Sequence, residues 1–285
     1  MPTKQQVGQV VVVLAACTAV FAADPARKEF RYPAGARSSV FILNQFGPIT
    51  VKPSSSDQVV VVAIPHSDKV QIQGAQNGDR VVIKSQLLPG TAPAAGRVDY
   101  EVEVPSGASV TLHSADGPLR AEQLEGDVTV ESDTAEVNLR DLAGGHVHVN
   151  TLNGPVILTN INNGHVEITS VAGDVTMNSV TGPFVEVTSA KGRINYSGDF
   201  GYTGNYKLTS HTGDIEAVVP AYASFDVSAK SVRGDVENDF PLTARPTATS
   251  PSAFQRGRSF VGSAGKAASS VIIRTFSGKI RLKTR

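Results

Sequence analysis

The sequence predicts an all-β protein whose main part is a β-solenoid, a stack of similar two-strand coils. Three observations indicate this fold. A short phrase, a small residue followed by a polar one and then by alternating apolar residues, recurs every nine or ten residues from Gly117 to Gly192, and Gly213 and Gly234 follow at steps of 21 residues. The alternation within each phrase is the period of a strand with one buried face. The 285 residues include 26 glycines and no tryptophan, as is typical of short strands joined by tight turns.

Residues 1–22 are expected to form a secretory signal peptide. Lys4 precedes an apolar stretch of 17 residues, from Val7 to Ala23, whereas a membrane-spanning helix needs about 20. Ordinary cleavage before Ala23 is the outcome we favour. Leu14–Cys17 also resembles a lipobox, which makes Cys17 a candidate for lipidation and would make the protein a lipoprotein. Cys17 is the only cysteine in the sequence, so no intramolecular disulfide can form.

Residues 30–105 are predicted to form an irregular β region that caps one end of the stack. Strands are expected at 40–43 and 59–64, where valine and isoleucine dominate. Two further strands are expected on either side of Asn77-Gly78, a pair typical of hairpin turns. Residues 88–96, "LPGTAPAAG", are expected to form a loop.

Residues 106–240 contain the regular repeats. Apolar residues fall two and four places after each small residue, as Val128 and Val130 do after Gly126, so each phrase is a short strand. Two phrases add up to a coil of 19 to 21 residues, and stacked coils give two parallel sheets around a narrow core. A β-sandwich with similar strand spacing is the alternative. The predicted turn glycines are Gly117, Gly126, Gly145, Gly154, Gly164, Gly173, Gly182, Gly192, Gly213, Gly234 and Gly278.

These glycines are expected at tight corners, where they supply a positive φ or a place in which a Cβ atom would clash. A further apolar residue often stands two or three places before the next glycine. We expect it to turn inward at the corner and extend the core. The residues concerned are Leu124, Leu142, Leu152, Ile161, Val171, Val180 and Val232.

The C-terminal part is expected to leave the repeat and return to it. Residues 241–270 are rich in proline, serine, alanine and glycine, which predicts a flexible loop. Residues 271–285, "VIIRTFSGKIRLKTR", are predicted to form one or two closing strands. Open sheet edges pair readily with other chains, so a solenoid needs capped ends. The N-terminal region and this closing segment are the predicted caps.

Several phrases together resemble a known family. "VDYEVEVPSGASVTLHSADGPLRAEQLEGDVTV", the run of "GDV" and "GPV" phrases and the closing "RTFSGKIRL" resemble a bacterial family of β-strand-repeat proteins. That family is labelled as a putative adhesin and as a domain of unknown function. The resemblance covers residues 40–285 and implies an exported domain similar to a β-solenoid. It implies no catalytic residues, since none are established for the family.

The sequence lacks the common motifs of catalysis. It has no G-x-S-x-G elbow, no glycine-rich phosphate loop and no H-E-x-x-H pair. Its Gly-Asp pairs lack the glycine pattern of the calcium β-roll. Basic and acidic residues number 26 each, and this balance argues against nucleic acid as the main partner. We therefore expect a protein that is not an enzyme and that needs no cofactor.

One cluster of side chains could bind a metal ion. If coils of 19 residues stack in register, His146 lies beside His165 and His148 lies beside Glu167 on one outer face. Imidazole and carboxylate groups suit zinc or copper. The candidate metal site is therefore His146, His148, His165 and Glu167. The alternative, which we favour, is that these residues are part of an ordinary polar sheet surface.

These observations favour an exported, non-enzymatic binding or adhesion module at the cell surface, in the periplasm or in the medium. Its partner would be a protein or a glycan of the cell envelope, with membrane contact only through a lipid anchor at Cys17. A structural envelope scaffold that assembles with itself or with a partner is the second hypothesis. A polysaccharide-active enzyme is the third.

Overall fold

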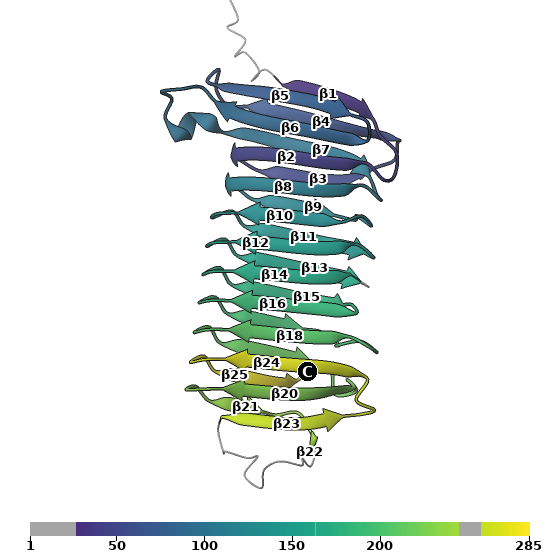
Figure 1. The fold of residues 1–285 in the computed structure, drawn as a ribbon, viewed down its shortest axis with the longest axis vertical. Coiled ribbons are helices and arrows are strands. Elements are labelled where there is room, and N and C mark those ends of the chain that lie inside the picture. The colour runs from purple at the N-terminus through teal and green to yellow at the C-terminus, as the bar shows by residue number, and fades with distance from the viewer. Residues whose placement is uncertain (1–26, 163, 245–257) are drawn as a thin grey trace, which may run out of the picture.

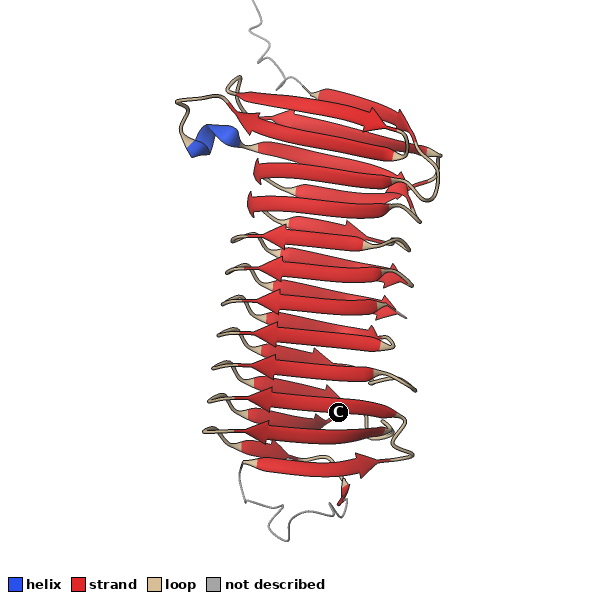
Figure 2. Ribbon diagram, in the orientation of Figure 1, coloured by secondary structure: helices blue, strands red, loops and turns tan. Residues whose placement is uncertain are grey.

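The chain folds into a rod in which two long β-sheets lie face to face (Figure 1). The computed structural model describes residues 27–162, 164–244 and 258–285. In these residues the only helical segment is the single turn η1, Pro93–Gly96 (Figure 2). None of the described helical residues belongs to a helix long and apolar enough to cross a membrane. The predicted signal peptide at residues 1–22, with Cys17, lies outside the described residues.

Most neighbouring strands in the two sheets run parallel, as a solenoid requires. Sheet A has the order β1-β4-β7-β3-β9-β11-β13-β15-β17-β19-β25-β21, and sheet B has the order β22-β23-β20-β24-β18-β16-β14-β12-β10-β8-β2-β6-β5. The predicted β-solenoid is therefore confirmed and the sandwich alternative is wrong. Sheet A consists of β1 (Lys28–Pro33), β3 (Ile49–Ser54), β4 (Gln58–Pro65), β7 (Val98–Pro105), β9 (Leu119–Glu122), β11 (Val137–Ala143), β13 (Val156–Asn162), β15 (Val175–Thr181), β17 (Ile194–Ser197), β19 (Ile215–Val219), β21 (Val236–Asn238) and β25 (Ile280–Thr284). Sheet B consists of β2 (Ser39–Phe46), β5 (Val70–Asn77), β6 (Arg80–Leu87), β8 (Ser109–Asp116), β10 (Val128–Ser132), β12 (His146–Thr151), β14 (His165–Ser170), β16 (Phe184–Ser189), β18 (Asn205–Ser210), β20 (Phe225–Ser231), β22 (Thr243–Ala244), β23 (Ser259–Ala264) and β24 (Ser269–Thr275).

Successive coils stack in register, so each side chain lies beside its counterpart in the next coil. Val147 of β12 pairs with Val166 of β14, and Val149 pairs with Ile168. All four side chains are buried between the sheets, while the residues between them in each strand face outward. Removing this apolar surface from water is the main force that drives folding. The result is one continuous core along the rod.

In each coil the chain passes from sheet B to sheet A through a corner at the left edge of the rod in Figure 1. We call this the hydroxyl corner. A buried serine or threonine stands three residues before each corner glycine, and Ser132 stands three residues before Ala135, which takes the place of the glycine in one coil. Ser170 Oγ donates to the carbonyl oxygen of Gly173 at 2.7 Å, and Gly213 N donates to Ser210 Oγ at 2.9 Å. A Cβ atom at Gly173 would collide with the carbonyl oxygen of Gly154 in the adjacent coil. The hydroxyl corner comprises residues 114–118, 132–136, 151–155, 170–174, 189–193, 210–214, 275–279 and 231–235.

Sheet A passes back into sheet B through a second kind of corner, which we call the left-handed corner. In four successive coils it contains one residue with φ between 55° and 58°, the left-handed region, namely Gln123, Asp141, Asn160 and Ser179. Asparagine and aspartate tolerate this conformation better than most residues. Asn160 Nδ2 also donates to Asp141 Oδ1 of the adjacent coil at 2.9 Å. The change of direction turns the next side chain into the core, so Leu124, Leu142, Ile161 and Val180 are buried.

The prediction that an apolar side chain turns inward at every corner is thus right for one corner and wrong for the other. Leu152, Val171 and Val232 lie on the hydroxyl corner and are 49%, 42% and 47% exposed. Each follows directly after the buried serine or threonine, which occupies the inward position of the turn. No left-handed residue precedes these three, so their side chains point away from the core.

The N-terminal region caps the stack, as predicted, but its first strands already belong to the solenoid. β2 pairs parallel with β8, and β3 pairs parallel with β9. The parallel coils therefore begin before residue 106, where the sequence predicted their start. The chain then leaves the stack, and β4 pairs antiparallel with β1 and β7 while β5 pairs antiparallel with β6. β4, β5 and β6 correspond to the strands predicted at 59–64 and around Asn77-Gly78.

The closing strands do not cap the other end. β24 lies between β18 and β20 and is parallel to both, and β25 lies between β19 and β21 in the same way (Figure 1). The last coil of the chain is thus inserted inside the stack. β21 is the last strand of sheet A at this end. In sheet B, β23 lies between β20 and β22 and is antiparallel to both.

The predicted loop at 241–270 therefore contains β22, β23 and the first residues of β24, while residues 245–257 lie outside the described part of the chain. The composition of β23, "SFVGSA", does not indicate a strand, because four of its six residues are small.

Candidate functional site

The outer face of sheet B carries rows of side chains that run along the rod, because its strands stack in register. One row, which we call the ring row, consists of His146, His165 and Phe184. The ring centroids of His146 and His165 lie 5.2 Å apart, and those of His165 and Phe184 lie 4.6 Å apart. Both histidines are exposed and Phe184 is half-buried. The ring row is therefore an accessible strip of planar groups.

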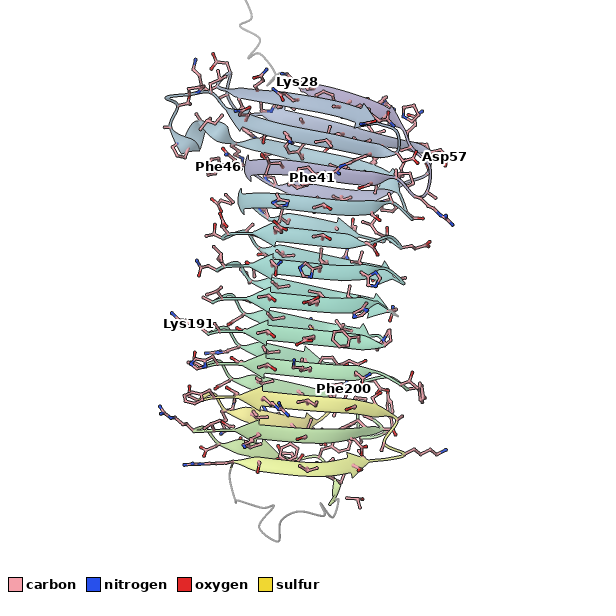
Figure 3. All side chains as sticks on the ribbon, in the orientation of Figure 1. Lys28, Phe41, Phe46, Asp57, Lys191 and Phe200 are labelled. Atoms are coloured by element: carbon pink, nitrogen blue, oxygen red, sulfur yellow. The ribbon has the colours of Figure 1, made fainter. Side chains whose placement is uncertain are left out.

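The neighbouring rows of this face combine imidazole, carboxylate, amide and hydroxyl groups. Asn150 Nδ2 lies 2.9 Å from His148 Nε2. Phe41, near the N-terminal cap on this face, packs against His113 with a centroid distance of 5.3 Å (Figure 3). Three histidines of the face have a carboxylate partner on an adjacent strand. These pairs are His113 Nε2–Glu131 Oε2 at 3.0 Å, His146 Nδ1–Asp127 Oδ1 at 3.2 Å and His148 Nδ1–Glu167 Oε2 at 3.5 Å.

The four residues of the candidate metal site share this face but form two separate pairs. His146 and His165 are neighbours in the ring row, and His148 and Glu167 form an ion pair in the next row. In the described ranges, no three histidine, cysteine, aspartate or glutamate side chains are arranged to hold a metal ion. His146 has Asp127 as its carboxylate partner, whereas Glu167 lies opposite His148. The geometry thus favours a polar sheet surface at these positions.

A groove of about 590 Å³ runs along one side of the same face, next to the hydroxyl corner. It crosses several coils and therefore lies at right angles to the strands. Its polar side offers groups that donate and accept hydrogen bonds, and its other side combines the apolar Leu152 and Val171 with the acidic Asp133. The side chains that matter most here are His113, Glu131, Asn150 and Thr169 on the polar side and Leu152 and Val171 on the apolar side.

The outer face of sheet A differs from that of sheet B. Near the N-terminal cap, Glu122 Oε2 accepts a hydrogen bond from Arg140 Nη2 at 2.5 Å and Oε1 pairs with Lys52 at 3.4 Å. The hydrogen bond from Arg140 lowers the pKa of Glu122 and outweighs the opposing effect of burial. Near the other end, Glu216 pairs with Lys283 at 2.9 Å. Between these charged ends the face is uncharged and presents Thr159, Thr176, Asn178, Asn195 and Ser197.

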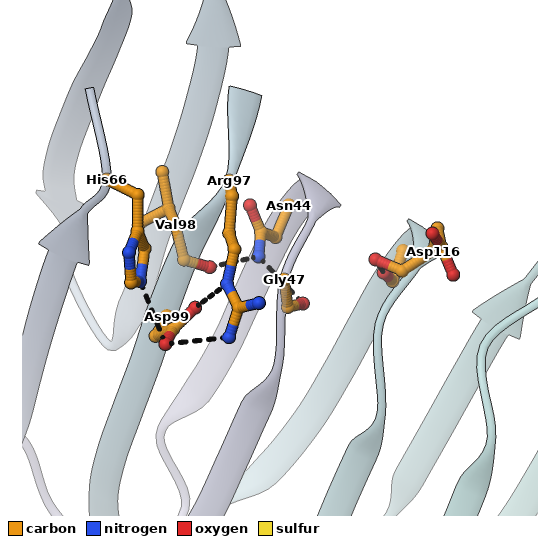
Figure 4. A network of polar contacts seen from close by, with 8 residues as sticks. Asn44, Gly47, His66, Arg97, Val98, Asp99 and Asp116 are labelled. Atoms are coloured by element: carbon orange, nitrogen blue, oxygen red, sulfur yellow. Dashed lines mark hydrogen bonds and ion pairs between the residues drawn. The ribbon is translucent and has the colours of Figure 1, made fainter. Parts of the chain in front are cut away.

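A further polar network joins the N-terminal cap to the stack (Figure 4). Asp99 Oδ1 accepts a hydrogen bond from Arg97 Nε at 2.9 Å, and Asp99 Oδ2 lies 3.0 Å from His66 Nε2. Burial alone would raise the pKa of Asp99, but the hydrogen bonds from Arg97 and His66 outweigh it and hold the pKa below its usual range. Nearby, the buried Asn44 donates to the carbonyl oxygen of Val98 at 2.8 Å. The Asn44 hydrogen bond joins β2 to β7, and the contacts of Asp99 join β7 to His66 at the end of β4.

The buried tyrosines are structural. Tyr196, Phe200 and Tyr206 pack together, with centroids of Tyr196 and Phe200 4.7 Å apart. Burial raises the pKa of Tyr206 to about 12 and raises that of Tyr196 as well. The Tyr196 hydroxyl donates to the carbonyl oxygen of Asp199 at 2.6 Å. Such hydroxyls stay protonated at neutral pH and bridge the backbone, so they do not serve as surface acids or bases.

The sequence reasoning missed the groove and the buried hydroxyl row. A signal for the hydroxyl row is present, because serine or threonine stands three residues before the corner glycine in phrase after phrase, as in Ser189 and Gly192. The groove was missed because Leu152 and Val171, its apolar side, were expected to point inward.

Comparison with known proteins gives a family and, among solved structures, several likenesses that include the following two. Residues 39–283 match the family described as Toastrack DUF4097. A structure described as a putative cell adhesion protein from Clostridium sporogenes ATCC 15579 is 12% identical with a TM-score of 0.29, over 91% of this chain and 100% of that chain. A structure described as a putative adhesin from Bacteroides fragilis NCTC 9343 is 9% identical with a TM-score of 0.39, over 90% and 96%. No curated protein matches the chain. The two structural likenesses are too weak to bear on its function.

Proposed function

The chain belongs to the toastrack DUF4097 family, and from that premise we propose that it is an exported, non-enzymatic binding module of the cell envelope. We further propose that its binding surface is the outer face of sheet B and that its ligand is a glycan chain. The observation that carries the proposal is that this face presents both the ring row and the groove, with the row of His148 and Glu167 between them. Binding sites usually combine apolar and planar contact with a few well-placed polar groups.

A glycan chain suits this arrangement for physical reasons. The flat, apolar face of a sugar ring can stack on exposed planar side chains such as His165 and Phe184. Asn150 and Thr169 in the groove supply an amide and a hydroxyl for hydrogen bonds to sugar substituents. The ring row and the groove both run along the rod, across the strands. A linear polymer lying along the rod would therefore contact several coils at once.

The titratable groups support a binding role over a catalytic one. Where a pKa is clearly shifted in the described residues, the group is a buried or partly buried tyrosine or a member of an ion pair, such as Asp99 and Glu122. A catalytic acid or base needs a pKa tuned toward its working pH and an open path to substrate. Glu131 and Glu167, the carboxylates beside the groove and the ring row, already pair with histidines.

The proposal is tested by equilibrium binding of an N-acetylglucosamine hexamer to the purified protein, measured by isothermal titration calorimetry. The double variant His165→Ala/Phe184→Ala removes two neighbouring rings and should weaken binding at least about tenfold, because each stacking contact contributes on the order of 1 kcal/mol. Asn178→Ala, on the outer face of sheet A, is the matched control and should bind as the unchanged protein does.

Absence of heat with the unchanged protein would contradict the glycan proposal. Equal weakening in the ring variant and the Asn178→Ala control would contradict the assignment to sheet B. Reducing sugar released from the hexamer during incubation would instead show an enzyme and would overturn the non-enzymatic role.

The export proposal has its own test. The intact mass of the protein isolated from cell envelopes should start near Ala23, or at a lipidated Cys17 if the protein is tethered. Protease treatment of whole cells then distinguishes the surface from the periplasm. A mass that retains residues 1–22 would contradict export with cleavage.

A further inference from the structure

The hydroxyl corner forms a continuous strip along one edge of the rod. Three residues of each corner are accessible there, two between the buried hydroxyl and the glycine and one after the glycine. Lys191 lies in this strip and projects from the left edge of the rod in Figure 3. In the order of the stacked coils, from β8 to β20, the first row reads Ala115, Asp133, Leu152, Val171, Ala190, His211, Phe276 and Val232. The second row reads Asp116, Thr134, Asn153, Ala172, Lys191, Thr212, Ser277 and Arg233, and the third reads Pro118, Glu136, Pro155, Asp174, Arg193, Asp214, Lys279 and Asp235.

The middle and one end of this strip are apolar. Leu152 and Val171 are exposed neighbours in the first row, and Val232 is exposed at its end. His211 and Phe276 stack with their ring centroids 5.0 Å apart and nearly parallel. Exposed apolar side chains that form a contiguous row commonly mark a protein interface.

Charge is divided unequally along the strip. The end near β8 and β10 carries Asp116, Asp133 and Glu136, and the strip becomes basic from Lys191 and Arg193 onward to Arg233. Across the described part of the chain, no ion pair engages any of these six side chains. Asp174 and Asp214 are held locally, because their carboxylates accept the backbone N–H groups of Arg193 and Lys279, each at 2.8 Å. The side chain of Lys279 pairs with Glu237 in the same chain.

We propose that this strip is a docking surface for a second copy of the chain, which lies antiparallel with its own strip against the first. A twofold axis across the strip, between the coils of β14 and β16, places each row against the same row of the partner copy in reverse order. Asp116 then faces Arg233, Glu136 faces Lys279 and Asp174 faces Arg193. Leu152 faces His211, and Val171 faces Ala190. No two like charges face each other in this register.

The parallel arrangement of two copies is disfavoured by the same charges. It would place each coil against its own counterpart, so that Asp116 meets Asp116 and Arg233 meets Arg233. Like charges brought together at an interface are destabilising, and complementary ones fix register and orientation. The charge pattern therefore selects the antiparallel pair.

The antiparallel pair has a consequence for the outer faces of the sheets. A twofold axis that lies across the strip keeps the sheet B side of one copy on the same side as the sheet B side of the other. The two ring rows then lie on one broad surface, and the grooves beside the hydroxyl corner flank the seam. The dimer does not depend on the proposed glycan, but it would give that ligand two copies of the face.

The size of the strip predicts a modest affinity. From β8 to β20 it spans seven steps in the order of sheet B, or about 34 Å at the usual strand spacing. A narrow strip of this length is smaller than the standard interface of about 800 Å² per partner, so a dissociation constant in the micromolar range is expected.

The test is sedimentation equilibrium of the purified protein over a range of concentrations. At low ionic strength the mass should rise toward that of a dimer, and added salt should shift it back toward the monomer because the facing charges are exposed. Asp116→Arg and Arg233→Asp should each raise the dissociation constant about tenfold, since each makes two facing charges alike. The double variant Asp116→Arg/Arg233→Asp restores opposite charges in both contacts and should dimerise as the unchanged protein does. Asn195→Glu, in the uncharged centre of sheet A, is the control and should leave dimerisation unchanged.

A protein that stays monomeric at about 100 μM and low salt would overturn the proposal, since micromolar affinity makes it mostly dimeric there. Failure of the double charge exchange to restore the dimer would overturn the antiparallel register. Binding of the N-acetylglucosamine hexamer by the single charge variants tests the two proposals separately. A variant that is monomeric and still binds the hexamer shows that glycan binding does not require the dimer.

Discussion

The two corners of the coil both turn the chain from one sheet to the other, but different residues form the turn. At the left-handed corner a residue with positive φ, such as Asn160, turns the following Ile161 into the core. At the hydroxyl corner a buried serine or threonine bonds the turn internally, and the following side chain, such as Leu152 or Val171, is left outside. The comparison shows that one corner extends the core and the other builds a surface. Similar sequence phrases therefore bury an apolar side chain on one edge of the rod and expose one on the other.

The largest expected difference between the corners concerns two leucines. Leu142 is 3% exposed at the left-handed corner, and Leu152 is 49% exposed at the hydroxyl corner. Leu142→Ala should lower the free energy of unfolding by about 2–5 kcal/mol, the usual range for a buried leucine. Leu152→Ala should change it by less than about 0.5 kcal/mol. Urea denaturation followed by circular dichroism measures both, and equal losses would show that the corners do not differ in burial.

The glycines provide the next largest difference. A Cβ atom at Gly173 would strike the carbonyl oxygen of Gly154, whereas one at Gly164 would lie 3.2 Å from the carbonyl oxygen of Gly145. Gly173→Ala should therefore cost about 1–3 kcal/mol, as overpacking does, and Gly164→Ala should cost clearly less. Thermal unfolding of the two variants side by side tests this ranking, and a reversed order would contradict it.

A smaller effect is expected from the hydroxyl row. Ser170 is buried, and its hydroxyl donates to the carbonyl oxygen of Gly173. Ser170→Ala should cost about 1 kcal/mol, the usual contribution of such a hydrogen bond. Thr169→Ala, one residue earlier on the outer face, is the matched control and should stay within about 0.5 kcal/mol. Equal effects from the two variants would show that the buried hydroxyl does not stabilise the corner.

The smallest effect is a pH dependence beside the left-handed corner. Glu122 immediately precedes Gln123, and the hydrogen bond from Arg140 holds its pKa below the ordinary value of 4.5. A pKa lowered by folding contributes stability that is present above the unfolded value and is lost as the pH falls through the folded value. Because Arg140 is exposed and Glu122 only half-buried, water screens the pair, and this contribution is less than about 1 kcal/mol.

As the pH falls below 5, Glu122→Gln should therefore lose slightly less of its free energy of unfolding than the unchanged protein does. Urea midpoints measured at several acidic pH values would reveal this. The same steep acid loss in Glu122→Gln and in the unchanged protein would assign the loss to other groups.

The architecture was predictable because in-register stacking leaves a strict pattern in the sequence. Alternation after each glycine, as in Val147 and Val149 after Gly145, identifies the strands and their buried face. The difference between the corners was not predictable from hydropathy alone. Hydropathy does not separate Leu142 from Leu152, whose environments differ because Asp141 has a left-handed φ and Thr151 is buried in the turn.

The order of the strands at the C-terminal end of the stack was also not predictable from the sequence pattern. β24 and β25 carry an ordinary repeat phrase, and nothing local shows that they lie between β18–β19 and β20–β21. Their placement depends on long-range pairing, which a local pattern does not encode. The histidine row was expected from the spacing of His146 and His165, whereas the pairing of His146 with Asp127 follows from side-chain conformations that spacing does not determine.

The most direct test of the surface role of the hydroxyl corner is site-specific cross-linking in solution. Single cysteines are placed in a chain in which Cys17, the only native cysteine, is changed to serine. Ala190→Cys lies beside the proposed twofold axis and should cross-link to its own copy with a short bis-maleimide. Thr134→Cys should not, because it would lie about 24 Å from its own copy, five strand spacings away.

Mixed Thr134→Cys and Ser277→Cys proteins should cross-link to each other, because these residues face each other in the antiparallel pair. Asn162→Cys, on the left-handed corner, serves as the control and should remain uncross-linked. This pattern would establish the hydroxyl corner as the interface. Cross-linking of Asn162→Cys as efficient as that of Ala190→Cys, or of Thr134→Cys with itself, would contradict the account.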